Sequence, residues 1–114
     1  MFKGLGQLGD MARMMKTARE MQERMAALQE ELAAIEVEGS AGGGLVRARV
    51  TAKGELKGIE IDPSILRPED REVVEDLVRA AIRDAQERAV ERSREEMAKI
   101  TAELGLPADL KLPF

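Results

Sequence analysis

The sequence predicts an α+β fold in which a long helix is followed by a three-stranded antiparallel sheet and a second long helix. Apolar residues repeat at helical spacing in residues 10–36 and 74–104, and they alternate at strand spacing between these two segments. Aromatic residues are nearly absent, since the chain holds only Phe2 and Phe114. The core must therefore be built from aliphatic side chains, which helices supply more easily than a β-sandwich does.

A single domain accounts for the chain, because 114 residues are about the size of one ordinary domain. Residues 1–9 hold three glycines and show little periodicity, so we expect a flexible N-terminal arm there. Residues 105–114 contain two prolines and end on apolar side chains, which predicts an extended C-terminal tail. The α-β-β-β-α domain then spans residues 10–104.

The first helix is predicted from a heptad stripe. Apolar side chains recur at alternating intervals of three and four residues, at Met11, Met14, Ala18, Met21, Met25, Leu28, Leu32 and Ile35. A helix of about 25 residues is roughly 40 Å long, which is more than one small domain can cover. Part of the stripe should therefore contact a partner. The charges beside it favour another helix or the sheet of a second copy over a parallel coiled coil.

Three short strands are predicted between the helices, because the period of the apolar residues changes to two. The strands are residues 35–38, 45–52 and 56–62. The glycine cluster at 42–44 and the Lys53-Gly54 pair predict the two turns. Pro63 ends the third strand, because proline fixes φ and has no amide hydrogen to donate.

The second helix is predicted to begin at Pro68, a residue that suits the first helical position. Acidic residues at 69, 70 and 72 then occupy the first turn, where the helix dipole favours negative charge. The apolar stripe of this helix is Val74, Val78, Ala81, Ala85, Ala89, Met97, Ile100 and Leu104. Gly105 and Pro107 predict its end.

The missing residue types exclude most enzyme chemistry. Without His or Cys there is no imidazole base, thiolate nucleophile, disulfide or Cys/His zinc site. A carboxylate-metal enzyme is the remaining alternative, but we expect no enzyme, no catalytic residue and no metal. Gly4, Gly6 and Gly9 match the spacing of a dinucleotide-binding turn, yet no strand precedes them, so no cofactor is expected.

Hydropathy predicts neither a membrane span nor secretion. The chain has no apolar run near 18 residues in length and no charged-then-apolar leader with a cleavage site. We therefore expect a cytoplasmic protein with no membrane partner.

The charge pattern suggests a polyanion as the partner. The net charge is −4, but cations gather near the start of the first helix and the end of the second. The candidate residues are Arg13, Lys16, Arg19, Arg24, Arg88, Arg92, Arg94 and Lys99. If both helices are anchored at the sheet, these ends project from it as basic tips that suit the phosphates of double-stranded DNA. On charge alone, the favoured interpretation is instead that Arg and Glu interleave on solvated helix faces.

The order of several local strings resembles the YbaB/EbfC family of bacterial nucleoid-associated proteins over nearly the whole chain. These strings are the Met- and Gln-rich segment 11–35, Gly42-Gly43-Gly44-Leu45-Val46, Ile59-Glu60-Ile61-Asp62-Pro63, Glu75-Asp76-Leu77-Val78 with Ala80-Ala81 and Asp84-Ala85, and Leu112-Pro113-Phe114. Arg83 departs from the family pattern, because relatives often have Asn at that position.

The resemblance implies a homodimer whose helices project like the arms of tweezers. It also implies a nucleoid protein that binds double-stranded DNA without chemistry, has little sequence specificity and influences nucleoid organisation and gene expression. Both helices would contact the DNA, and charge and position assign that contact to the eight basic residues named above. The alternative is a helical interaction module that docks a replication or recombination protein and binds DNA incidentally.

Overall fold

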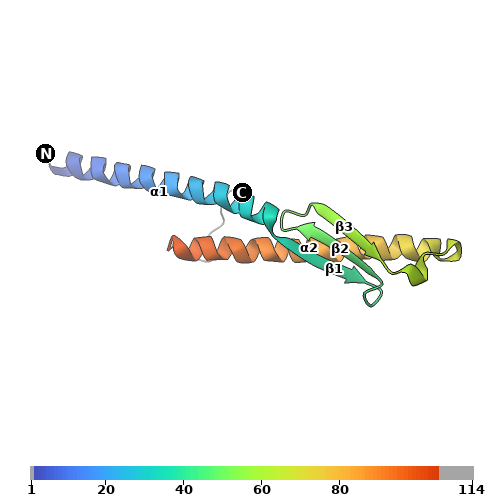
Figure 1. The fold of residues 1–114 in the computed structure, drawn as a ribbon. Coiled ribbons are helices and arrows are strands. Elements are labelled where there is room, and N and C mark those ends of the chain that lie inside the picture. The colour runs from blue at the N-terminus through green and yellow to red at the C-terminus, as the bar shows by residue number, and fades with distance from the viewer. Residues whose placement is uncertain (1, 106–114) are drawn as a thin grey trace.

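The computed structural model describes residues 2–105 of the chain, with side chains from residue 7 onward. The elements in order are α1 (Phe2–Ala34), β1 (Glu36–Ala41), β2 (Val46–Thr51), β3 (Leu56–Ile61), two 3-10 turns η1 (Pro63–Ile65) and η2 (Pro68–Asp70), and α2 (Arg71–Glu103). The predicted order of helix, three strands and helix is confirmed. The molecule measures 83 × 22 × 17 Å, because α1 continues far beyond the sheet (Figure 1).

The start of α1 differs from the expectation. The helix begins at Phe2 rather than at Asp10, so the backbone of residues 2–9 continues α1 instead of forming a separate arm. Extending an existing helix costs far less than starting one, and each glycine in it costs only about 1 kcal/mol. The predicted tail beyond Gly105 lies outside the described residues.

The start of α2 also differs from the expectation. Pro68 opens the 3-10 turn η2, and α2 itself begins at Arg71. Residues 68–70 form a 3-10 turn because the amide of Asp70 donates to the carbonyl of Arg67, which is three residues back and not four. Glu72 is consequently the only acidic residue in the first turn of α2.

The sheet is antiparallel with the strand order β1-β2-β3. One face is apolar, and its β2 residues Val46, Ala48 and Val50 are fully buried. The opposite face is polar and exposed. There Arg49 of β2 lies 3.6 Å from Glu36 of β1.

Helix α2 covers the apolar face over β1 and β2. Val46, Ala48 and Val50 pack there against Ala81, Ala85 and Ala89. Because these side chains of α2 are small, the backbone of the helix lies very close to β1. A Cβ added to Gly39 of β1 would lie 2.2 Å from the backbone nitrogen of Ala85, so no side chain fits at position 39.

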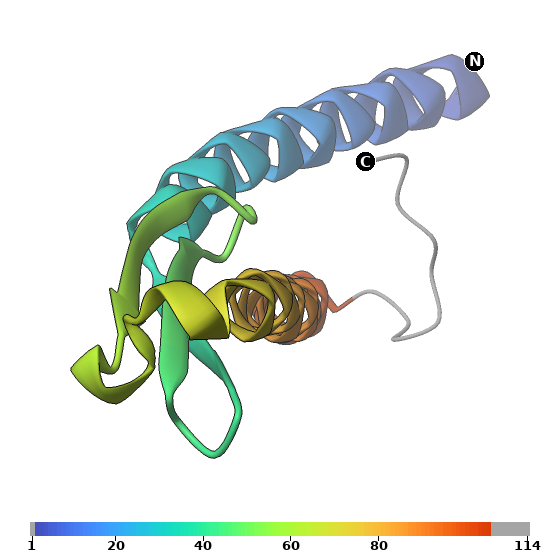
Figure 2. The same cartoon turned by 90° about the vertical axis from the view of Figure 1, so that its right-hand side faces the viewer.

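Helix α1 is anchored only near its C-terminal end. Leu28 and Leu32 form a second small cluster with Ala52 and Ile100. By contrast, every described side chain of α1 before Met21 is exposed. Figure 2 looks nearly along α2 and shows α1 leaving it toward the N terminus. The side chains of residues 7–20 are therefore not buried against the described body of the molecule.

Replacing Gly39 with Ala should destabilise the fold, because the added methyl group would force α2 away from β1. We expect Gly39→Ala to lower the free energy of unfolding by about 1–3 kcal/mol, measured by urea denaturation. Gly9→Ala is the matched control, since nothing lies within 4 Å of a Cβ at that position. Equal unfolding midpoints for Gly39→Ala and the unmodified chain would contradict the close packing.

Candidate nucleic-acid interface

The first candidate surface is the projecting part of α1, residues 7–20, called here the α1 arm. Its side chains are exposed on all sides of the helix. Three of the eight predicted basic residues lie on it, namely Arg13, Lys16 and Arg19. Within the described part of the chain, none of the three forms an ion pair, although most other cations do. Their charge is therefore available to an external anion.

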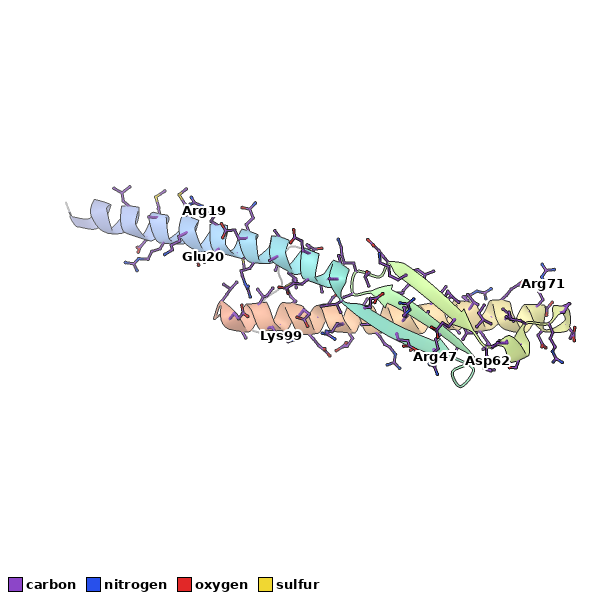
Figure 3. The ribbon with its side chains drawn as sticks, in the orientation of Figure 1. Arg19, Glu20, Arg47, Asp62, Arg71 and Lys99 are labelled. Carbon is purple, nitrogen blue, oxygen red and sulfur yellow. The ribbon has the colours of Figure 1, made fainter. Side chains whose placement is uncertain are left out.

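The arm carries different groups on different sides. In Figure 3, Arg19 points away from α2, whereas Glu20 points to the side on which α2 lies. The heptad stripe continues along α1 into the anchored part, where Leu28 and Leu32 are buried. Arg19 therefore lies on a different side of α1 from the heptad stripe.

The four basic residues predicted on α2 have acidic partners. Each lies beside an acid about one helical turn away, and the pairs are Arg88–Asp84 at 3.2 Å, Arg92–Glu96 at 3.1 Å, Arg94–Glu91 at 3.9 Å and Lys99–Glu96 at 3.1 Å. The two pairs in which both partners are largely exposed or half-exposed, Arg88–Asp84 and Arg94–Glu91, are weak, each worth about 0–1 kcal/mol, whereas the shared carboxylate of Glu96 is mostly buried. All four pairs lower the local positive potential, so α2 is less basic at its end than its cation count predicts.

Two acids on α2 are held ionised by these contacts. Lys99 and then Arg92 donate hydrogen bonds to the carboxylate of Glu96 and lower its pKa below the ordinary value. The pKa of Asp84 is lowered chiefly by the backbone amide of Ser40, which donates to the carboxylate at 3.0 Å, and then by Arg88. Asp84 thus ties α2 to β1 as well as holding Arg88.

The remaining candidate, Arg24, joins the two helices. Its guanidinium forms an ion pair with Glu103 near the end of α2. In Figure 1 the end of α2 lies beside the middle of α1. The arm and the last turns of α2 both lead away from the sheet, but Arg88 and Arg92 lie beside β1, where they line a pocket with Val37. The arm also extends well past the end of α2, so the two sets of cations form separate surfaces.

An open groove of about 830 Å³ lies between α1, the β2–β3 turn and α2. Its apolar lining includes Leu32, Ala52 and Met97, and the cations Lys53 and Arg94 also line it. Sequence patterns could not reveal this groove, because its walls come from three segments that are far apart in the chain.

Two further features bear on what the surface can do. Among residues 7–105, no three acidic side chains come together in a way that could hold a metal ion. No described helix is long and apolar enough to cross a membrane.

Comparison with known proteins shows that this chain resembles a sequence family, several named relatives and a solved structure. The sequence model of the YbaB/EbfC DNA-binding family matches residues 7–104. A nucleoid-associated protein of Agrobacterium fabrum is 47% identical over 105 residues, which cover 92% of this chain and 98% of that protein. One from Bradyrhizobium is 51% identical over 100 residues, which cover 88% and 94%.

A solved structure shares the fold. The crystal structure of an uncharacterized protein from Helicobacter pylori aligns with a TM-score of 0.62 and 26% sequence identity. The alignment covers 75% of this chain and 88% of that chain.

The contact between Asp84 and β1 should make stability depend on pH. The folded-state pKa of Asp84 lies below its ordinary value of 3.8, so the ionised carboxylate stabilises the fold above that pH. This stabilisation by the Asp84 carboxylate is lost as the pH falls through its lowered pKa. We expect Asp84→Asn to unfold at lower urea than the unmodified chain at neutral pH, and the difference to close in acid. Asp76→Asn, which alters an exposed acid on the same helix, is the control; a gap that persisted in acid would refute the linkage.

Proposed function

This chain belongs to the YbaB/EbfC DNA-binding family, and we propose that it is a non-enzymatic homodimer that binds double-stranded DNA through the α1 arm in the bacterial nucleoid. Its relatives in Agrobacterium and Bradyrhizobium are named nucleoid-associated proteins. By binding along the chromosome with little sequence specificity, the dimer would influence nucleoid organisation and gene expression.

The observation that carries this proposal is the set of cations on the α1 arm. Arg13, Lys16 and Arg19 project from the body and have no described acidic partner. A phosphate approaching the arm meets these charges without displacing a protein carboxylate. Each contact also releases counterions from the DNA, so binding should depend strongly on salt.

The cations of α2 would contribute less to the affinity. Arg92 and Lys99 share the carboxylate of Glu96, and Arg88 is held by Asp84. A phosphate must compete with these acids for the same donors. We assign α2 a supporting role, in which its cations contact DNA that the arms have already bound.

The overall charge of −4 does not oppose this arrangement. Exposed charges separated by more than about 10 Å are largely screened at moderate salt, so DNA responds to the local surface. Because α1 carries the arm away from the body, the acids of the sheet and of the start of α2 lie far from the bound phosphates (Figure 1).

The dimer follows from apolar surface that one chain leaves uncovered. Met11 and Met14 on the heptad stripe are 59% and 70% exposed, and the groove beside Met97 is open. A long helix with an exposed apolar stripe gains stability by burying it against a partner. We infer that a second copy covers both the stripe and the groove, which would double the number of arms that contact DNA.

The interaction-module alternative is less well supported. Docking of a replication or recombination protein would use the same apolar surface, but the family match identifies DNA binding as the shared property. DNA affinity that required an added protein would favour this alternative.

Reversing the charge of the arm should abolish DNA binding. We expect the triple variant Arg13→Glu, Lys16→Glu, Arg19→Glu to bind duplex DNA about a hundredfold more weakly or worse, measured by titration of labelled duplex at low salt. In the unmodified dimer, about five phosphate contacts should give a slope near −4 to −5 for log affinity against log salt.

A matched control reverses the same number of charges at the other end of the molecule. The variant Arg67→Glu, Arg71→Glu, Arg79→Glu has the same net charge as the arm variant and alters residues that are ion-paired near the start of α2. It should bind DNA nearly normally. Equal losses in the two variants would show that net charge, and not the arm, governs binding.

A charged substitution on the stripe, at Met14, or in the groove, at Val90, should separate the two copies. We expect the unmodified protein to have twice the chain mass of 12.5 kDa in solution, and Met14→Glu or Val90→Glu to shift it toward the single-chain mass, measured by light scattering. Leu66→Glu is the control, because Leu66 is exposed outside both the stripe and the groove. A Met14→Glu protein that stayed fully dimeric would place the interface elsewhere.

A further inference from the structure

Two exposed apolar side chains on the α1 arm are left unexplained by the dimer. Leu8 and Met15 are 64% and 62% exposed. Neither belongs to the heptad stripe. At about 100° per residue, both lie roughly a quarter turn around α1 from the centre of that stripe. A second copy that packs along the stripe would leave them in solvent.

These two residues share a face with a cation. Leu8, Met15 and Arg19 fall within about 40° of one another around the helix, and Lys16 lies at the edge of the same face. The face thus combines apolar contact surface with cations that have no described acidic partner.

We propose, on the basis of the DNA-binding function above, that this face enters the major groove and that Leu8 and Met15 contact the C5-methyl groups of thymine. The neighbouring cations Arg19 and Lys16 would contact the phosphates beside the groove. An α-helix with its side chains is about 10–12 Å across and fits a major groove about 12 Å wide. Thymine is the only base that presents an apolar group there.

Charge complementarity selects DNA as the occupant of this face. A protein partner would cover an apolar pair with its own apolar residues and would need acids for Arg19 and Lys16. DNA supplies both kinds of contact at once, since phosphates border a groove in which thymine methyl groups are exposed. The arm would therefore carry a preference for A·T-rich duplex within otherwise unspecific binding.

The test compares two duplexes of the same A·T-rich sequence, one with thymine and one with deoxyuridine at every thymine position. The substitution removes only the methyl groups. We expect the full-length protein to bind the uridine duplex at least about fourfold more weakly, the effect of losing one buried methyl. The double variant Leu8→Gln, Met15→Gln should bind both duplexes equally, with an unchanged salt slope. Leu66→Gln, which alters an exposed apolar residue outside the arm, the stripe and the groove, should keep the difference.

Three results would overturn this inference. They are equal binding of both duplexes by the unmodified protein, a methyl effect that persists in the double variant, and a double variant that falls to the single-chain mass, which would assign Leu8 and Met15 to the dimer interface. Failure to bind either duplex at low salt is a different result, because it would refute the DNA-binding function itself.

Discussion

The close approach of α2 to β1 is the contact on which the rest of the structure depends. At Gly39 the strand meets the backbone of α2 near Ala85 with no side chain between them. This packing commits the apolar face of the sheet to α2. Helix α1 is left with a small cluster around Ala52 and Ile100 as its anchor, so more than a third of its length projects as an arm. The projecting arm thus results from the close packing of α2 on the sheet, which leaves α1 only a small surface to pack against.

The cations of α2 and the cations of the arm differ in whether an acid pairs with them. Along α2, acids one turn away engage the cations, as Glu96 engages Lys99. On the arm, Arg13 and Arg19 have no such partner among the described residues. This difference in pairing is the reason that we propose the arm as the main site for a polyanion. Duplex DNA is the ligand that we propose for this surface, and the sequence between Phe2 and Phe114 holds no aromatic residue on which single-stranded bases could stack.

The sequence predicted the elements well where periodicity was strong. Alternation predicted a strand over residues 45–52, and β2 lies there with the alternating residues Val46 and Val50 fully buried. The glycines before Gly9 hid the true start of α1, because local propensity does not show that an established helix can extend through them. Ion pairs between residues one helical turn apart, such as Arg92 with Glu96, can be predicted from their spacing in the sequence. The pair of Arg24 with Glu103 is not, since 79 residues separate its partners and only the fold brings them together.

Site-specific crosslinking tests most directly whether the arm is the DNA-binding element. The chain has no native cysteine, so a photoreactive group can be attached at one chosen position. Ala12→Cys places it on the arm, and Ser64→Cys places it on an exposed turn at the far end of the sheet. If the α1 arm binds DNA, position 12 will give strong crosslinks to duplex DNA and position 64 essentially none. Crosslinks mainly from position 64, or equal yields from both, would contradict this prediction.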